Sequence, residues 1–343
     1  MYKHITLCLS ALFLFVACID KKECNESFLD LFETKKYVTL TEFMPELKNK
    51  IQGPTQFYWL NQYILFVEPK LDSLLFVYDS KSNNSKYFFP KGQANNEAIS
   101  IQLNKGKKST YCSVYDNALQ KAYLFKLNDN FVDSIEFDSL IPKGSMKASI
   151  VYDDTLAFYE HVGNDKRFTA ITPHKTIHFG NEISIKNLSS STLTKVLQGP
   201  CSLSASKKKF FWFASFGDVF EIYDYSNIDS IKTVCSLTAK LPHANINGAL
   251  TPEDKLGVTH VTSDNNYIYA LYVGKTIKEG MTNRATSLYT NKILVFDWNG
   301  NPCKVLNLNR EVFSIAYSEM YDKLYCLGLD DDLNYTIYAV DNI

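Results

Sequence analysis

The 343-residue chain lacks the short motifs that mark the common catalytic sites. It has no GxSxG nucleophile elbow, HExxH zinc motif, Walker loop, GxGxxG turn or pair of CxxC motifs. Its net charge is close to zero, with 36 Lys and Arg against 37 Asp and Glu, so no overall field attracts nucleic acid. The local run Lys207-Lys208-Lys209 is interpreted as a solvated turn rather than a phosphate site. The sequence therefore predicts no catalytic residue, metal site, cofactor or nucleic-acid partner.

Long apolar runs are absent except at the N-terminus. Residues 1–17 combine a basic start with an apolar core from Ile5 to Val16, which is too short to anchor the chain and indicates a signal peptide. The sequence Phe15-Val16-Ala17-Cys18 is similar to the bacterial lipobox, although Phe15 departs from the usual Leu. We therefore expect Cys18 to be the lipid attachment site; the alternative is an ordinary secretory peptide.

Residues 18–36 are expected to form a lipid-anchor linker that contains a short helix. That helix is predicted within 24–36, where Phe28, Leu31 and Phe32 fall on one face. The rest of the chain has no apolar segment of spanning length, so we expect membrane contact through the lipid alone. This predicts a location in the bacterial cell envelope, at the outer membrane on its periplasmic or surface face.

Eight cysteines invite a disulfide interpretation in an oxidising compartment. Cys8 leaves with the signal peptide and Cys18 is expected to be modified, which leaves six. Five of the six lie inside apolar strand segments, and none has a metal-like spacing. We expect them to be small buried hydrophobic side chains rather than disulfides or metal ligands.

A unit of four strands recurs from residue 55 to the last residue. Each unit contains apolar or alternating runs bounded by turn residues, the pattern of strands in packed sheets. In the clearest unit, strands are expected at 258–263, 267–273, 292–297 and 303–308, with Asn299-Gly300 as a type I′ hairpin turn. The spacing of about 43 to 57 residues suits a propeller blade. First strands are predicted to begin near Thr55, Ala98, Lys147, Pro200, Gly257 and Val312.

The final unit has only three strands, and Tyr37 to Phe43 has the pattern of the missing fourth. A strand supplied from the N-terminus would close a ring of blades and remove an exposed sheet edge. We therefore predict an all-β fold over residues 37–343: a six-bladed β-propeller of four-stranded blades, closed by the N-terminal strand. The alternative, a tandem of two-sheet sandwiches, does not predict a three-strand unit completed in this way.

Three segments carry a resemblance to a known family. They are SDNNYIYALYVGKTIKE at 263–279, NKILVFDWNGNP at 291–302 and FSIAYSEMYDKLYCLGL at 313–329. They resemble the TolB-like six-bladed propeller lipoproteins of Gram-negative bacteria, and the resemblance covers essentially the whole mature chain. It implies a propeller on a lipid anchor, but no particular activity and no catalytic residue.

In a propeller, the loops from fourth to first strands and from second to third strands converge over one mouth of the central channel, where ligands usually bind. The longest such loops are expected at 180–199, 238–257 and 275–291. His260, on the neighbouring first strand, is expected to point into the channel. The alternative is that these loops only cover the ring and His260 is a core residue. The candidate binding residues are His243, Asn245, Asn247, His260, Lys275, Arg284 and Tyr289.

These features favour a lipid-anchored, monomeric envelope protein that acts as a non-enzymatic binding module. Its expected partner is an envelope protein, a peptide or a glycan. One alternative is a metal-assisted hydrolase, lyase or lactonase, for which Gln56, Gln102 and Asp153 are the nearest candidate ligands in the channel. The other alternative is a structural component of an envelope assembly.

Overall fold

The computed structural model describes residues 27–128, 131–137, 146–153, 155–161, 165–180, 183–185 and 188–341. The predicted signal peptide, Cys18 and Cys24 lie outside these residues. The other five predicted mature cysteines are free thiols; Cys112, Cys201 and Cys326 are buried, as predicted, whereas Cys235 and Cys303 are only partly buried. Within the described chain, no helix is both long enough and apolar enough to cross a membrane.

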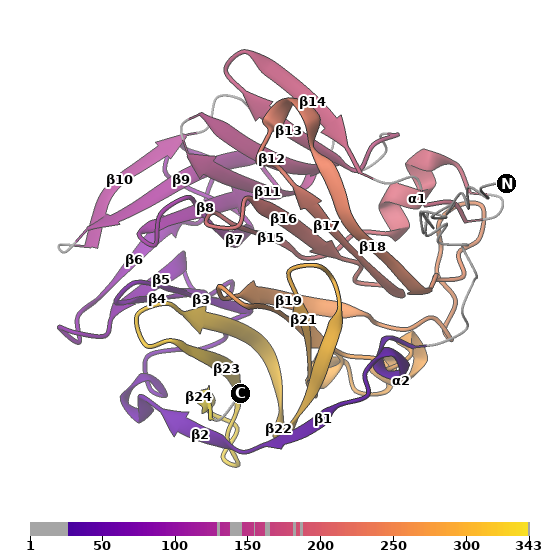
Figure 1. The fold of residues 1–343 in the computed structure, drawn as a ribbon. Coiled ribbons are helices and arrows are strands. Elements are labelled where there is room, and N and C mark those ends of the chain that lie inside the picture. The colour runs from indigo at the N-terminus through magenta and orange to yellow at the C-terminus, as the bar shows by residue number, and fades with distance from the viewer. Residues whose placement is uncertain are drawn as a thin grey trace, which may run out of the picture.

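The fold is all-β and propeller-like, with sheets arranged around a common centre (Figure 1). Four of the sheets have four antiparallel strands each. The first contains β3 (Gln56–Leu60), β4 (Tyr63–Val67), β5 (Ser73–Asp79) and β6 (Ser85–Pro90). The second contains β7 (Ile101–Lys105), β8 (Tyr111–Asp116), β9 (Lys121–Asn128) and β10 (Phe131–Phe137). The third contains β11 (Met146–Asp153), β12 (Leu156–His161), β13 (Phe168–Thr172) and β14 (Lys175–Phe179), and the fourth β15 (Cys201–Ser204), β16 (Lys209–Phe213), β17 (Asp218–Asp224) and β18 (Lys232–Lys240).

The fifth sheet is larger and has eight strands. Its long strand β22 (Pro302–Ser318) pairs with β21 (Thr290–Asp297) through its first half and with β23 (Lys323–Leu329) through its second half. The sequence predicts two separate strands here, at 303–308 and 312–318. The intervening Asn309-Arg310-Glu311 contains neither Gly nor Pro, so nothing breaks the extended chain. The other strands are β19 (Val258–Ser263), β20 (Tyr267–Tyr272), β21 (Thr290–Asp297), β23 (Lys323–Leu329), β24 (Tyr335–Val340), β1 (Lys35–Val38) and β2 (Leu40–Phe43).

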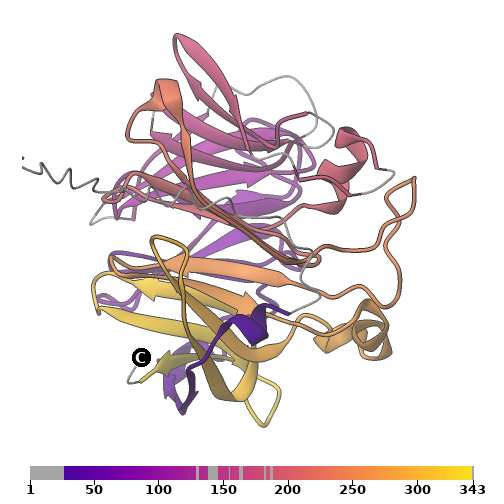
Figure 2. The same ribbon diagram turned by 45° about the vertical axis from the view of Figure 1, so that its right-hand side comes forward.

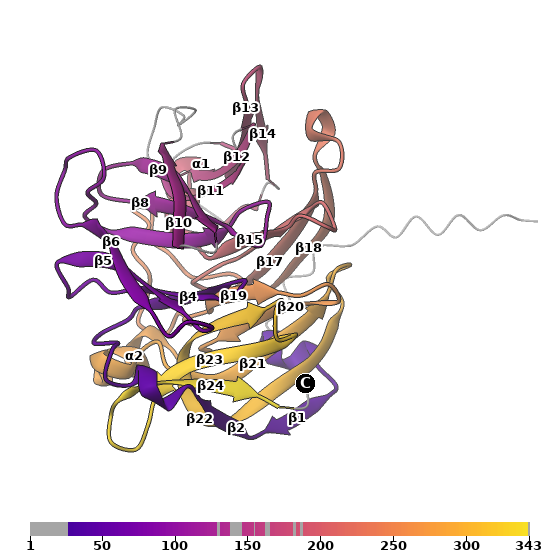
Figure 3. The same cartoon turned by 90° about the vertical axis from the view of Figure 1, so that its left-hand side faces the viewer.

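The N-terminal segment forms two strands where the sequence predicts one over 37–43. β1 runs parallel to β22, with Lys35 opposite Val305, whereas β2 is antiparallel to β24, with Leu40 opposite Val340 (Figure 3). The predicted helix over 24–36 is shorter than expected. It is a four-residue 3-10 helix, η1 (Phe28–Leu31), which Ser27 caps, and β1 already begins at Lys35.

The expected type I′ turn at Asn299-Gly300 is not formed. Gly300 has a φ of 89°, but Asn299 is not among the residues with positive φ. The carboxylate of Asp297 accepts hydrogen bonds from the N–H groups of Asn299 and Asn301, at 2.8 and 2.9 Å. The turn is therefore one residue longer, which puts a bulge between β21 and β22.

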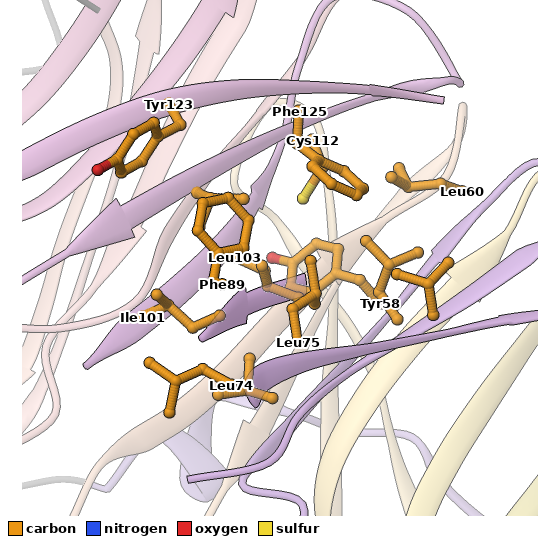
Figure 4. Close-up of a cluster of buried hydrophobic side chains, with 14 of the residues drawn as sticks. Tyr58, Leu60, Leu74, Leu75, Phe89, Ile101, Leu103, Cys112, Tyr123 and Phe125 are labelled. Carbon is orange, nitrogen blue, oxygen red and sulfur yellow. The ribbon is translucent and has the colours of Figure 1, made fainter. Parts of the chain in front are cut away.

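Large apolar side chains fill the space between neighbouring sheets. Figure 4 shows one such core, where Tyr58 of β3 and Leu75 of β5 meet Phe89, Cys112 and Phe125 from β6, β8 and β9. All five residues are buried. Because each sheet presents an apolar face to the next, the sheets are held at fixed positions around the centre.

The first strands β3, β7, β15 and β19 surround the centre together with the second half of β22, whereas β11 packs against the second sheet. β3 lies beside the second half of β22 and beside β7, while β19 lies beside β22 and β15. Helices occupy connections between strands. They are η2 (Pro45–Leu47), α1 (Ser190–Val196), η3 (Ile228–Ser230), α2 (Ile277–Thr282) and η4 (Arg284–Thr286).

Candidate functional site

A cavity of about 480 Å³ lies where the inner strands begin. Its wall is formed by residues at the starts of β3, β7, β15 and β19, and we call it the amino-end cavity. A second cavity, of about 360 Å³, lies where the same strands end, and we call it the carboxyl-end cavity. The two cavities therefore mark opposite ends of the molecular centre.

Uncharged hydrogen-bonding groups dominate the wall of the amino-end cavity. The lining contains no Asp, Glu, Lys or Arg. Its polar side chains are amides and hydroxyls, together with one imidazole and one thiol. The amides and hydroxyls, the latter including one phenol, belong to Thr55, Gln56, Tyr58, Ser100, Gln102, Asn104, Asn117, Gln198, Ser215 and Thr259. Such a surface can donate to and accept from a neutral polar ligand without burying a charge.

His260 is the imidazole in this wall. Its Nδ1 lies 3.3 Å from the hydroxyl oxygen of Ser314, on the inner half of β22. Burial lowers the pKa of His260 to about 4, because the charged form loses its hydration. The ring is therefore neutral at pH 7, which keeps the whole wall uncharged.

The Ser314–His260 pair does not have the geometry of a nucleophile with its base. Ser314 is fully buried, and its hydroxyl oxygen accepts a hydrogen bond from the N–H of Phe57 at 3.3 Å. A nucleophile must be able to reach the substrate, and this hydroxyl is enclosed between β22 and β3. The pair instead connects neighbouring inner strands.

Two amides of the wall have different roles. The Gln56 side chain accepts from the N–H of Leu103 at 3.0 Å and donates to its carbonyl at 3.2 Å, so it links β3 to β7. The Oδ1 atom of Asn117 is buried and has no hydrogen-bond partner in the described structure. Such an unpaired buried acceptor is unusual in a folded protein.

The two long loops of the predicted binding face lie against each other. The N–H of Leu256 donates to the carbonyl of Lys275, and the N–H of Ile277 donates to the carbonyl of Asp254, each at 2.8 Å. A Cβ at Gly248 would lie 2.9 Å from Thr192, so the 238–257 loop also approaches α1. Figure 2 shows α1 and α2 on one side of the molecule. These loops thus form a continuous layer.

Most of the predicted site residues belong to this layer and do not line either cavity; only His260 does. The His243 side chain is exposed, and its ring lies 3.3 Å from Asp254. Asn245 accepts from the N–H groups of Asn247 and Ala249, so it holds its own turn. Arg284 is exposed on η4.

Lys275 and Tyr289 have structural partners. The ammonium of Lys275 donates to the carbonyl of Tyr289 at 2.8 Å and to Glu311 at 2.9 Å. The Tyr289 ring packs on Phe313 with centroids 4.9 Å apart, and burial raises its pKa to about 12. Both residues therefore hold the 275–291 loop in place.

The candidate metal ligands do not converge. Gln56 and Gln102 line the amino-end cavity, whereas Asp153 accepts from the ammonium of Lys107 at 2.8 Å, and Lys107 lines the carboxyl-end cavity. Among the described residues, no group of three or more His, Cys, Asp or Glu side chains is placed to hold a metal ion.

Sequence reasoning did not single out Asn104, Asn117 or Gln198 as wall residues. Asn104 lies one residue beyond the predicted first strand at 98–103 but inside β7, so the available signal was an amide next to a strand expected to line the channel. Asn117 and Gln198 lie in connections, and no local pattern distinguishes them from other loop amides.

The arrangement of four-stranded sheets around two central cavities agrees with one family model, that of the TolB-like 6-blade propeller-like family, which matches residues 54–320. The chain belongs to this family. The resemblance found in the sequence is therefore confirmed at the level of the family. No curated protein matches this TolB-like propeller.

Solved structures similar to the TolB-like propeller include two whose sequences are distant. One is the β-propeller domain of Cps50 (Swd1) from Myceliophteria thermophila, with 10% identity, a TM-score of 0.43, and coverage of 84% of this chain and 97% of that one. The other is U3-55K, with 9% identity, a TM-score of 0.48, and coverage of 84% and 80%.

Proposed function

We propose that this TolB-like propeller is a non-enzymatic binding module that takes a protein, peptide or glycan partner at the end that carries the amino-end cavity. The propeller fold in general supports an interaction module. The observation that carries the proposal is the uncharged, amide- and hydroxyl-rich wall of that cavity. The adjoining layer of loops adds exposed polar groups, including His243, Asn247 and Arg284.

The chemistry of the wall favours a neutral polar group from the partner. Sugar hydroxyls and peptide amides both donate and accept hydrogen bonds, as the amides of the wall do. A charged group would lose its hydration in the cavity without meeting an opposite charge. Its desolvation would therefore cost more free energy than that of an uncharged polar group. The part of the partner that enters the cavity is therefore a hydroxyl-rich or amide-rich segment.

Replacing wall amides by a side chain of similar length tests this site. The double variant Gln102→Met/Gln198→Met keeps the volume but removes two amides, and Gln93→Met, at an exposed residue outside the cavity, is the matched control. Binding would be measured against arrays of neutral glycans and peptides and by capture from intact envelopes. We expect the double variant to lose about tenfold or more in affinity, since each lost hydrogen bond is worth about 1 kcal/mol. Equal binding by the double variant and the wild type would contradict the proposal.

We further propose that the ring has six four-stranded blades and that β2 supplies the outer strand of the last. The pairing of β2 with β24 and the division of β22 between two neighbours support this count. Deletion of residues 37–43 should lower the melting temperature sharply, while deletion of 19–22 should have little effect. Equal melting temperatures would remove the argument for closure.

The lipid anchor at Cys18 and the envelope location remain part of the proposal, and the lipobox-like sequence supports them. Two or more acyl chains on one residue would hold the module firmly on a membrane. The Cys18→Ser variant should appear in the soluble fraction after signal cleavage. If it stays with the membrane, or if labelled fatty acid never enters the wild type, the anchor is elsewhere or absent.

A further inference from the structure

The carboxyl-end cavity differs from the amino-end cavity because charged side chains line it. Lys105, at the end of β7, is the most enclosed of its cations, with a side chain that is 15% exposed. Its ammonium lies 3.3 Å from the carboxylate of Glu319, which follows β22 and is 58% exposed. The pair therefore joins a largely enclosed cation to a carboxylate on the exposed rim.

The Lys105 ammonium has more donors than this contact uses. A lysine ammonium carries three N–H donors. Glu319 takes one, and in the part of the chain that the structure describes no other acceptor lies within hydrogen-bond distance; the Tyr317 ring centroid is 6.0 Å away. Because Lys105 lines the cavity and its side chain is only 15% exposed, its remaining donors are available to a ligand bound there.

The other carboxylates of the lining are already engaged within their own turns. Asp264 accepts from the N–H groups of Asn266 and Tyr267, each at 2.6 Å, and from the Tyr269 hydroxyl at 2.7 Å. Asp322 accepts from the Tyr317 hydroxyl. The free hydrogen-bonding capacity is therefore on Lys105 rather than on Asp264 or Asp322.

A second lysine and neutral polar groups extend this surface. The Lys108 side chain is exposed in the β7–β8 turn, where its ammonium lies 5.0 Å from the Tyr111 ring centroid. The hydroxyls of Ser109 and Ser204 also belong to the lining, and Trp59 forms part of the wall. We propose that the carboxyl-end cavity binds a small ligand through an oxyanion, a carboxylate or a phosphate, which joins or displaces Glu319 at the ammonium of Lys105.

Tryptophan fluorescence offers a direct test, because Trp59 lines this cavity and the other two tryptophans of the chain do not. The full-length mature protein would be titrated at low salt with inorganic phosphate, with glucuronate, and with glucose as the uncharged comparison. We expect phosphate, glucuronate or both to change the signal saturably and glucose to have no effect. A response to phosphate alone would assign a phosphorylated ligand, and a response to glucuronate alone would assign a carboxylated one.

Three variants assign the response to the cavity. Lys105→Met should weaken oxyanion binding about tenfold or more, since a hydrogen bond to a charged donor is lost. Glu319→Gln should tighten binding about two- to fivefold, because the competing carboxylate no longer occupies the ammonium. Lys278→Met, which removes an exposed charge from α2, is the matched control and should bind as the wild type does.

Several results would overturn this proposal. They are the absence of saturable binding up to about 10 mM of either oxyanion, an equal response to glucose, and unchanged affinity in Glu319→Gln. The Glu319→Gln result tests the proposal even if Lys105→Met is unstable. The Glu319 side chain is largely exposed, so its replacement leaves the core intact.

Discussion

Replacing Phe28 by alanine should weaken the packing of the N-terminal segment against the rest of the propeller. The Phe28 ring is fully buried and lies 6.1 to 6.3 Å, centroid to centroid, from the rings of Phe213, Tyr272 and Phe296. Its N–H also donates to the buried carboxylate of Asp218 at 3.1 Å. Removing a buried Phe side chain typically costs about 3–5 kcal/mol. In the variant the short N-terminal segment can detach, so the protein need not keep an empty cavity. We therefore expect the free energy of unfolding to fall by an amount near the lower limit of this range, about 3 kcal/mol.

Urea unfolding followed by far-UV circular dichroism would measure this loss. With a urea slope of about 3 kcal/mol/M, the midpoint should fall by about 1 M. Tyr37→Ala is the matched control, because it removes another aromatic ring from the same segment, and that ring is 86% exposed. It should change the free energy of unfolding by less than about 0.5 kcal/mol. If Phe28→Ala is as stable as Tyr37→Ala, the segment contributes little to stability and our reasoning fails.

Two further predictions concern ionisable groups that are largely shielded from solvent. Burial lowers the pKa of His260 to about 4, so below pH 6.5 the unfolded chain gains a proton that the folded protein does not, and stability falls as the pH falls from 6.5 towards 4. Between pH 7.5 and 5 the wild type should lose about 2 kcal/mol more than His260→Gln in urea unfolding, and parallel pH profiles would show that His260 is not responsible. The buried ion pair of Arg167 with Glu221, 2.7 Å apart, predicts that Arg167→Met costs about 3–5 kcal/mol because an unpaired carboxylate remains. The double variant Arg167→Met/Glu221→Gln should recover most of that loss, and equal stability of the single and double variants would contradict this account.

Local sequence patterns were sufficient to predict the positions of most strands. The predicted strands at 63–68, 85–90 and 258–263 agree with β4, β6 and β19 to within a residue. Alternation of side chains and the residues that favour turns are properties of a few neighbouring positions, so they can be recognised without knowing the fold. The signal for α2 was also present, since Thr276 and Glu279 form a capping box, but the helix has only six residues and was predicted as loop.

Partners of strands were harder to predict than the strands themselves. The sequence of 37–43 indicates extended chain, but it does not indicate that the segment divides, so that β1 pairs with β22 and β2 with β24. That division depends on which sheet edges lie within reach, and an edge exists only once distant strands have assembled. For the same reason, the sequence does not indicate that β22 is one strand that pairs with both β21 and β23.

The sequence by itself determined the all-β class, the repeated unit and the family, because each is written in short-range spacing. Only the tertiary structure decided the site. Gln56, Gln102 and Gln198 are far apart in the chain, and they line one cavity because β3, β7 and β15 begin at the same end of the propeller. His243 and Arg284 are as polar, yet they remain in the outer loop layer. The physical reason is that a cavity wall is a property of strands brought together through space, and the residue spacing along one strand does not record its distance from another.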